Sequence, residues 1–428
     1  MSKFYFGQDG ELISEEIQKS IKLSYKDFRK NKKSNGILFD FVGILIQEDK
    51  QLIVFPKHMY SEEQVLDCQN NPDVGIQRFR LVMDVIQKYI LVEQSKATAD
   101  DYAGILDELI ESSFPFEAFY GVYGYFQKYG IFTEKRRQIT ENGSGKYHWK
   151  TIIEKSQPYM NSSGIVFSPL YKERVMNDYS FISEAMAYVI NETIERFYYL
   201  LPYDKVEGVN YSASEFDDHQ YVLHRLSSIL SRTFKDIDVS LIKDLIVFFE
   251  DESKKYSPKD QHLKIHYFNN IWQGMINNYL NRHFEKIDQM KPVFSKDVIS
   301  RRIPYFKNKS LVIDDSNNHW SINMDHYHQD QEFQLIFDSK YYDDEDELNY
   351  KQISYHEVMT KKVRNTDVVT ISALVFPGSN RMDVHYKTAN SILVREINGD
   401  LKVITDEVFI YSIWIDVQEV MKDYLLSN

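Results

Sequence analysis

The sequence has little of what several classes of protein require. Cys68 is its only cysteine among 428 residues, which excludes a disulfide scaffold or a zinc site of several thiolates and is typical of a reducing compartment. No apolar run approaches the ~18 residues of a transmembrane helix. The first residues, Met1-Ser2-Lys3-Phe4, lead into a polar segment instead of the apolar core of a signal peptide. We therefore expect a cytoplasmic protein that makes no membrane contact.

Glycine and proline are also scarce, with 16 and 10 residues, whereas 31 tyrosines and 27 phenylalanines argue against disorder. At roughly 100–200 residues per domain, the length predicts two to four domains with hydrophobic cores. Basic residues are outnumbered, and the net charge is −13. This charge argues against promiscuous DNA binding, because such binding depends on neutralising phosphates. A local basic groove, or contact with DNA through a partner, stays open.

The first part of the chain predicts a β-rich region followed by helices. Apolar runs at 37–46 and 52–55 flank a polar turn and predict a β-hairpin. We expect residues 1–75 to be a β-rich region that docks a partner or DNA, with a partner favoured, and residues 76–260 to be a helical middle region. Helical patterns cover residues 13–33, 79–90, 182–197 and 222–284, whereas residues 130–180 look irregular.

The sequence pattern changes near Pro304, beyond which predicted strands alternate with predicted helices. We therefore expect an α/β domain over residues 261–428, and an α+β multidomain fold for the chain. The expected elements are strands at 311–314, 320–325, 333–338 and 368–376, a helix from about Asn349, a hairpin near 391–405 and a final helix at 413–425.

Two of these strands end in acidic residues. Asp325 ends one, and Asp338-Ser339-Lys340 ends the next. Side chains two apart on a strand share a face, so Asp338 and Lys340 project together, and a hairpin partner would add Asp325. Two carboxylates and the Ser339 carbonyl are hard ligands suited to Mg²⁺. The lysine would lower the pKa of an attacking water or stabilise phosphorane charge.

Simpler readings of these residues stay open. The aspartates and lysine could be an exposed, charged strand end. Asp314 and Asp315 are rival candidates for the first carboxylate of the site, in place of Asp325. His326 and His328 could bind a transition metal, but a substrate-facing or exposed position is favoured. Basic residues that flank the site could contact phosphate or be solvated; these are Arg301, Arg302, Lys361, Lys362 and Arg364.

The strand–strand–helix order continues into Lys351-Gln352 and Tyr355, and resembles the PD-(D/E)xK nuclease superfamily. In that fold an acidic residue, a (D/E)-x-K motif and a helix carrying Gln or Lys and Tyr surround the metal. The resemblance implies that Gln352 and Tyr355 join the active site, where they would orient the lysine or contact the backbone.

Five segments in chain order extend the likeness to residues 40–380. They are Phe41-Val42-Gly43 with Leu52-Ile53-Val54-Phe55-Pro56-Lys57, Gly145-Lys146-Tyr147-His148-Trp149-Lys150-Thr151-Ile152, Phe268-Asn269-Asn270-Ile271-Trp272, Asp338-Ser339-Lys340-Tyr341-Tyr342 with the helix that follows, and Leu374-Val375-Phe376-Pro377-Gly378. Together they resemble LlaJI-type restriction endonucleases and, more distantly, McrC-type subunits. The resemblance implies a Mg²⁺-dependent endonuclease of a restriction (phage-defence) system, with double-stranded DNA as substrate and a McrB-like AAA+ GTPase as partner.

Two positions depart from the family pattern. Gln273 stands where the family usually has Glu, and Met324 stands where a Pro normally precedes the first Asp. They motivate one alternative, a catalytically dead scaffold of the same fold, although the intact Asp338 and Lys340 argue against it. The other alternative is a self-sufficient, site-specific type II endonuclease that acts as a dimer.

Overall fold

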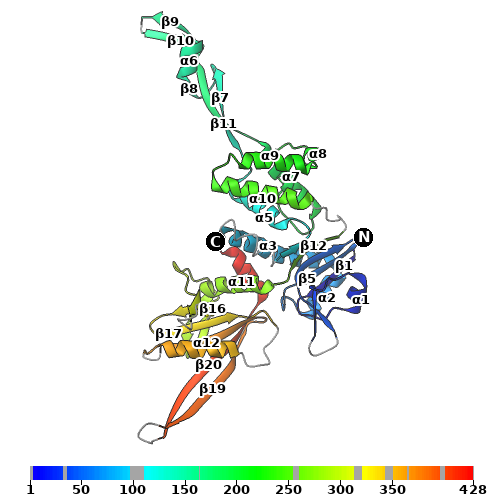
Figure 1. Cartoon of the computed structure of the whole chain (residues 1–428), viewed down its shortest axis with the longest axis vertical. Helices are drawn as coiled ribbons and strands as arrows, with labels where there is room; N and C mark the ends of the chain where they lie inside the picture. Colours follow the sequence, from blue (N-terminus) through cyan, green and yellow to red (C-terminus); the bar gives the residue numbers. More distant parts are fainter. Residues whose placement is uncertain are drawn as a thin grey trace. The chain divides into compact units, whose positions relative to one another are not determined.

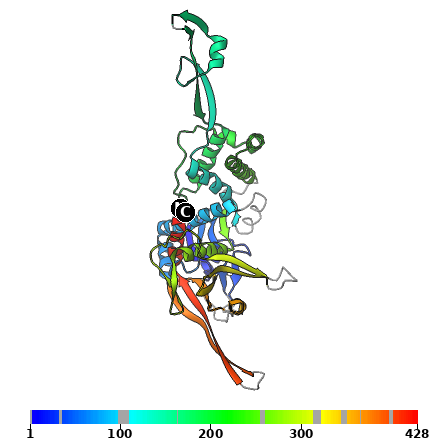
Figure 2. The same ribbon diagram turned by 90° about the vertical axis from the view of Figure 1, so that its left-hand side faces the viewer.

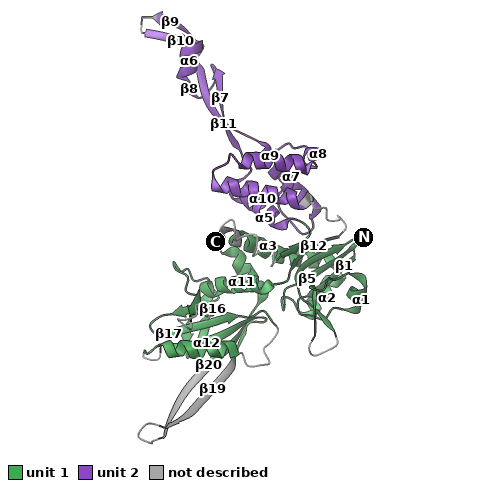
Figure 3. Cartoon of the chain, viewed as in Figure 1, with its two compact units in different colours: residues 1–114, 256–428 green, residues 115–255 purple. Residues whose placement is uncertain are grey.

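The structure is a computed structural model that describes residues 3–31, 36–96, 110–162, 164–253, 260–312, 321–342, 350–363, 366–395 and 401–427. Two compact units make up the chain (Figure 3). The first joins Met1–Phe114 with Tyr256–Asn428, and the second is Pro115–Lys255. The chain contains both helices and several separate sheets, in agreement with the α+β class expected from the sequence. Among the described helices, none has both the length and the apolar character needed to cross a membrane.

A five-stranded sheet forms the amino-terminal part of the first unit (Figure 1). The predicted hairpin is confirmed, because β4 and β5 pair antiparallel with Gly43 opposite Val54. Gly43, at φ +150°, also pairs with Lys264 of β12, where a Cβ atom would lie 2.0 Å from the Leu263 carbonyl oxygen. In sheet order the strands are β1 (Lys3–Gln8), β5 (Lys50–Phe55), β4 (Val42–Gln47), β12 (Asp260–Ile265) and β6 (Ile110–Ser112).

The helix expected over residues 13–33 is largely wrong. Only α1 (Glu15–Ser20) is helical, and β2 (Phe28–Lys30) pairs with β3 (Ile37–Phe39). The reason is a long-range ion pair. The two carboxylate oxygens of the fully buried Asp27 accept hydrogen bonds from Lys264 Nζ, at 2.9 Å and 3.0 Å. This contact draws the chain away from a helical path. Two further helices follow β5, α2 (Glu62–Asn70) and α3 (Pro72–Lys96).

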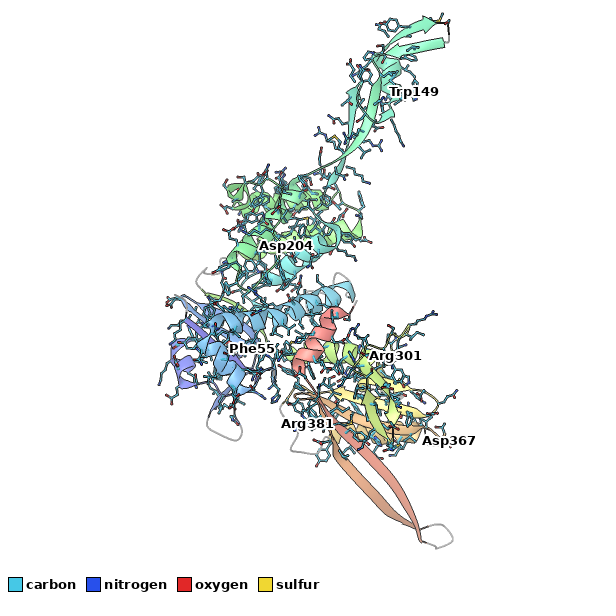
Figure 4. All side chains as sticks on the ribbon, turned by 180° about the vertical axis from the view of Figure 1, so that it is seen from behind. Phe55, Trp149, Asp204, Arg301, Asp367 and Arg381 are labelled. Atoms are coloured by element: carbon cyan, nitrogen blue, oxygen red, sulfur yellow. The ribbon has the colours of Figure 1, made fainter. Side chains whose placement is uncertain are left out.

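The second unit combines a helical body with a β-rich arm (Figures 1 and 2). Its helices are α5 (Phe116–Tyr129), α7 (Phe181–Arg196), α8 (Ala213–Phe216), α9 (His219–Leu230) and α10 (Asp236–Ser253). The segment expected to be irregular is instead the arm, which carries Trp149 (Figure 4). Its elements are β7 (Glu134–Glu141), β8 (Lys146–Tyr147), α6 (Trp149–Lys155), β9 (Gln157–Asn161), β10 (Gly164–Ser168) and β11 (Tyr171–Asp178).

A six-stranded sheet forms the carboxy-terminal part of the first unit. Its order is β15 (Lys307–Val312), β16 (Ser321–Gln329), β17 (Phe333–Ser339), β18 (Val369–Pro377), β20 (Leu401–Ile415) and β19 (Arg381–Arg395). β17 and β18 agree with the expected strands to within one residue. β16 runs to Gln329, so Asp325 lies inside this strand and not at its end, and the hairpin of β19 and β20 is longer than expected. A short hairpin, β13 (Phe284–Asp288) and β14 (Lys291–Phe294), precedes them.

Three helices accompany this sheet. α12 (Tyr350–Val363) connects the parallel strands β17 and β18, as parallel pairing demands. α11 (Phe268–His283) buries Trp272 completely. The final helix, α13 (Val417–Leu426), begins later than expected, because Tyr411 to Ile415 pair with β18 as part of β20.

Candidate active site

Two neighbouring strands bring the candidate carboxylates together. β16 and β17 are antiparallel, and Asp325 and Asp338 lie one residue beyond the outermost pair of their ladder, His326 with Phe337. β17 is a buried, mostly apolar strand that carries Asp338 at its carboxyl end. The Ser339 backbone N–H donates a hydrogen bond of 3.3 Å to Asp325 Oδ2. This bond holds the Asp325 carboxylate against the end of β17.

Both carboxyl groups are withdrawn from solvent and act on each other. Asp338 is only 1% exposed. Burial, together with the neighbouring Asp338, raises the pKa of Asp325 to about 7. Burial also disfavours the charged form of Asp338, yet the neighbouring Asp325 and the Lys340 ammonium outweigh it and lower the pKa of Asp338. One carboxylate of the pair is therefore firmly charged, and the other is easily protonated.

Two lysines converge on the charged carboxylate. Lys340 forms an ion pair with Asp338 Oδ2, and Lys351 Nζ lies 4.0 Å from the same oxygen. Lys351 is in the first turn of α12, with its Nζ 5.2 Å from the ring centre of Tyr355. Burial opposes the charged form of Lys351, but Asp338 and Tyr355 together raise its pKa. This end of the sheet can therefore receive a further negative charge, such as that of a phosphate.

The helix residues expected at the site support it from α12. Gln352 is fully buried, and its Nε2 donates to the Ile336 carbonyl at 2.9 Å, which ties α12 to β17. Tyr355 is partly buried against the apolar cluster that includes Ile336 and lies beside Lys351. Both residues thus fix the position of the helix that presents Lys351.

The expectation that His326 faces substrate or solvent is wrong. Its ring is fully buried, Nε2 hydrogen-bonds Ser339 Oγ, and Nδ1 lies 3.3 Å from Asn277 Oδ1. Burial lowers the pKa of His326 to about 4, so the imidazole is neutral. His328 also packs inside, with its ring stacked on Tyr305. His326 therefore connects α11 to the segment that carries the candidate carboxylates.

The basic residues that flank the site differ in what they contact. Arg301 donates to the carbonyl oxygens of Asn281, at 2.8 Å, and Phe284 (Figure 4), so these donors serve the end of α11. Arg302, by contrast, is exposed.

Lys361 and Lys362 are exposed in the last turn of α12. Arg364 lies outside the described residues, as do the rival acids Asp314 and Asp315. On α12, Lys361 and Lys362 are therefore the exposed candidates for contact with phosphate.

The carboxylates and the Ser339 carbonyl suit a hard divalent cation. Apart from the Lys340 contact on Oδ2, the buried Asp338 oxygens have no hydrogen-bond donor of good geometry among the described residues. Within those residues no group of three or more His, Cys, Asp or Glu side chains could hold a metal ion. Mg²⁺ needs fewer protein ligands, because it keeps several waters and binds through one or two carboxylates. The residues present therefore fit Mg²⁺.

The sequence model of the LlaJI restriction endonuclease family matches residues 41–397. The chain belongs to the LlaJI restriction endonuclease family. The match spans both units and includes Asp325, Asp338, Lys340 and Lys351. The resemblance found in the sequence is thereby confirmed, and the candidate site lies within the residues that the LlaJI family model matches.

One solved structure is similar over nearly the whole LlaJI-family chain. It is a half-complex from a tetradecameric assembly of Thermococcus gammatolerans McrB AAA+ hexamers with bound McrC. The TM-score is 0.39 with 11% identity, and the alignment covers 99% of each chain. No curated protein matches the chain.

The sequence reasoning gave Lys351 no role at the site, and it missed the burial of His326. For Lys351 a signal existed, because Lys351 and Tyr355 are four residues apart and share a helix face. For His326 there was none, since alternation along a strand does not say which polar side chain will be buried.

Proposed function

We propose that this chain is a Mg²⁺-dependent DNA endonuclease of a restriction system, with a nuclease domain of the PD-(D/E)xK type. The observation that carries the proposal is the Asp325–Asp338 pair, in which Asp338 is buried and in contact with Lys340, inside the range matched by a restriction endonuclease family. The order β16, β17, α12, β18 agrees with the strand–strand–helix order that suggested this type of domain.

In this proposal Asp325, Asp338 and the Ser339 carbonyl hold the cation. Bound Mg²⁺ supplies Lewis-acid activation of the scissile phosphate. Lys340 orients the attacking water and, with Lys351, stabilises the negative charge that develops on the phosphoryl oxygens. Water attacks phosphorus, and the 3′-oxygen leaves. Arg302, Lys361 and Lys362 contact the DNA backbone.

Cleavage of supercoiled plasmid tests the active site. We expect Asp338→Asn and Lys340→Ala to lower the rate about a hundredfold or more, because the first weakens the cation site and the second removes a positive charge that stabilises the phosphoryl oxygens. Asp383→Asn is the matched control, since Asp383 is an exposed acid on the same sheet, with 65% of its side chain accessible. EDTA should abolish wild-type cutting. Equal cutting by wild type and Asp338→Asn would show that the active site is elsewhere.

The proposal includes a McrB-like AAA+ GTPase as partner, and its support is the sequence resemblance. Cleavage is therefore measured with and without the GTPase and GTP. Cutting by the chain alone would favour the self-sufficient type II enzyme. The dead-scaffold alternative predicts that calorimetry shows no Mg²⁺ binding that depends on Asp325 and Asp338.

A further inference from the structure

A pocket of about 340 Å³ lies beside the candidate active site, inside the first unit. One of its walls comes from the amino-terminal part of the first unit and includes Arg29 of β2 and Lys57, which follows β5. The other comes from the start of α11 and from the residues that follow β17, among them Lys340 and Tyr341. Because Lys340 also contacts Asp338, this residue belongs both to the pocket and to the candidate active site.

Strand topology explains why the amino-terminal sheet reaches this place. β1 and β5 are parallel neighbours, so their carboxyl ends meet at one edge of the sheet. Asp9 follows β1 and Lys57 follows β5; both are buried, with Lys57 Nζ 3.9 Å from Asp9 Oδ1. The Lys57 backbone N–H donates to Tyr341 Oη at 2.9 Å. The edge of this sheet thus touches the residue next to Lys340.

The chemistry of the lining favours an uncharged, aromatic ligand. Opposite charges on the amino-terminal wall compensate each other: Lys57 faces Asp9, and Arg29 Nε lies 3.4 Å from Asp40 Oδ1. Tyr341 and Tyr342 line the pocket and are only partly buried. Tyr341 also packs against Phe268, and Tyr342 against Phe376, so each ring is held in place beside the pocket. Nucleobases stack on such rings and hydrogen-bond to amide and charged side chains through their edges.

The opposite wall supplies an amide for such a hydrogen bond. Asn269 lines the pocket from the first turn of α11 and is exposed. Phe268, its neighbour in sequence, packs against Tyr341 with ring centres 5.3 Å apart and holds that ring in place. A base that stacks on Tyr341 can therefore reach Asn269.

We propose that this pocket holds the nucleobase of the nucleotide adjacent to the scissile phosphate, so that the amino-terminal sheet is part of the DNA site. The inference rests on the proposed nuclease function, because Asp338 and Lys340 set the position of the phosphate. A base in the pocket is outside the duplex stack. The substrate strand is therefore unpaired or opened at that nucleotide.

Photocrosslinking of the full-length chain tests this assignment without cleavage. The probes are oligonucleotides, single-stranded and duplex, that carry iododeoxyuridine at successive positions, with EDTA present to prevent cutting. Mass spectrometry then locates the crosslinked residue. We expect crosslinks at Tyr341 or Tyr342 from one nucleotide position. Crosslinks at other residues alone, or none at all, would overturn the proposal.

Two pairs of neighbouring residues give matched controls. Asn269→Ala removes a hydrogen-bond donor from the pocket, and Arg29→Gln replaces a charged donor with a weaker neutral one, so each should lower the yield of this crosslink about fivefold. Asn270→Ala and Lys30→Gln should leave it unchanged, since both residues are exposed and neither lines the pocket. The comparison is close, because Asn269 and Asn270 share a hydrogen bond of 3.0 Å that either substitution removes. Equal yields within each pair would also overturn the proposal.

Plasmid cleavage by the same variants separates this inference from the proposed function. If cutting depends on Asp338 but the crosslinks lie away from the pocket, the nuclease stands and the base pocket falls. If the crosslinks lie in the pocket and no condition gives cutting, DNA binding at this place stands and the nuclease proposal falls. Circular dichroism of each variant checks that it has folded.

Discussion

Polar side chains that are buried behind the candidate site fix the sheet to its helices. His356 of α12 is one of them: it is 4% exposed, and its Nδ1 lies 2.9 Å from Ser372 Oγ of β18. Burial lowers the pKa of His356 to about 4, against a usual value of 6.5. The packing of α12 on the sheet therefore requires the His356 imidazole to be neutral.

This histidine should make folding sensitive to acid. Between about pH 6.5 and pH 4 the unfolded chain binds a proton at His356 that the folded chain does not, so stability falls as the pH falls through this window. The full loss is about 3 kcal/mol. His356→Asn keeps a hydrogen-bonding group near Ser372 but cannot titrate. Urea unfolding at pH 7 and pH 4.5 should show a smaller acid-induced loss in this variant than in wild type. An equal loss in both would contradict the assignment.

For single residues, the sequence predicts which side chains share a face of a strand, because strand geometry alone determines it. Asp338 and Lys340 are two residues apart on a strand, and the structure places them in contact. Burial depends on what packs against a strand from elsewhere in the chain. That is why the buried positions of His326 and His356 could not be read from the sequence.

Among the helices and strands, side chains close the ends that backbone pairing leaves open. Gln69 of α2 covers the edge of β1: it accepts from the Phe6 N–H at 3.1 Å and donates to the Phe4 carbonyl at 2.8 Å. Lys88 of α3 does the same for the carboxyl end of α13, where its Nζ donates to the Tyr424 carbonyl at 2.6 Å. Exposed strand edges and helix ends otherwise carry unsatisfied backbone groups.

Removing the Lys88 ammonium should loosen α13. Lys88→Met keeps the aliphatic stem but loses the donor and its charge at the negative end of the helix, so we expect a loss of about 1–2 kcal/mol in the free energy of unfolding. Urea denaturation measures the loss, and hydrogen exchange should show faster opening of the α13 amides. Lys422→Met is the control, because Lys422 is an exposed lysine on α13 itself. If both variants lose the same stability, Lys88 does not cap the helix.

The sequence predicted elements well where burial is regular along the strand. Strands β17 and β18 have buried apolar runs, and the hairpin of β4 and β5 has a clear polar turn. The arm was missed because a strand such as β7 is exposed on both faces and shows no alternation. The later part of the segment 13–33 was wrongly predicted as helix, because the ion pair of Asp27 with Lys264 joins residues far apart in the sequence.

On the scale of the whole molecule, the second unit is an insertion between two neighbouring strands of the first. β6 leads into it and β12 follows it, and these strands pair with Ser112 opposite Leu263. Ser113 strengthens the junction, since its N–H donates to the His262 carbonyl and its Oγ accepts from the His262 N–H. The chain therefore leaves and re-enters the first unit at nearly the same point. Pairing over such a sequence distance cannot be read from local patterns.

Replacing residues 115–255 with a short Gly/Ser linker should therefore leave the first unit folded, because the paired strands hold the ends of the linker together and closing a short loop costs little. We expect cooperative urea unfolding and a rise in melting temperature with Mg²⁺ that matches the full-length chain. Asp338→Asn in the shortened chain is the control and should abolish this rise, because the carboxylate that holds the cation is lost. An aggregated or non-cooperative product would show that the first unit needs the insertion in order to fold. A Mg²⁺ effect that survives Asp338→Asn would instead place the cation away from the carboxyl end of β17.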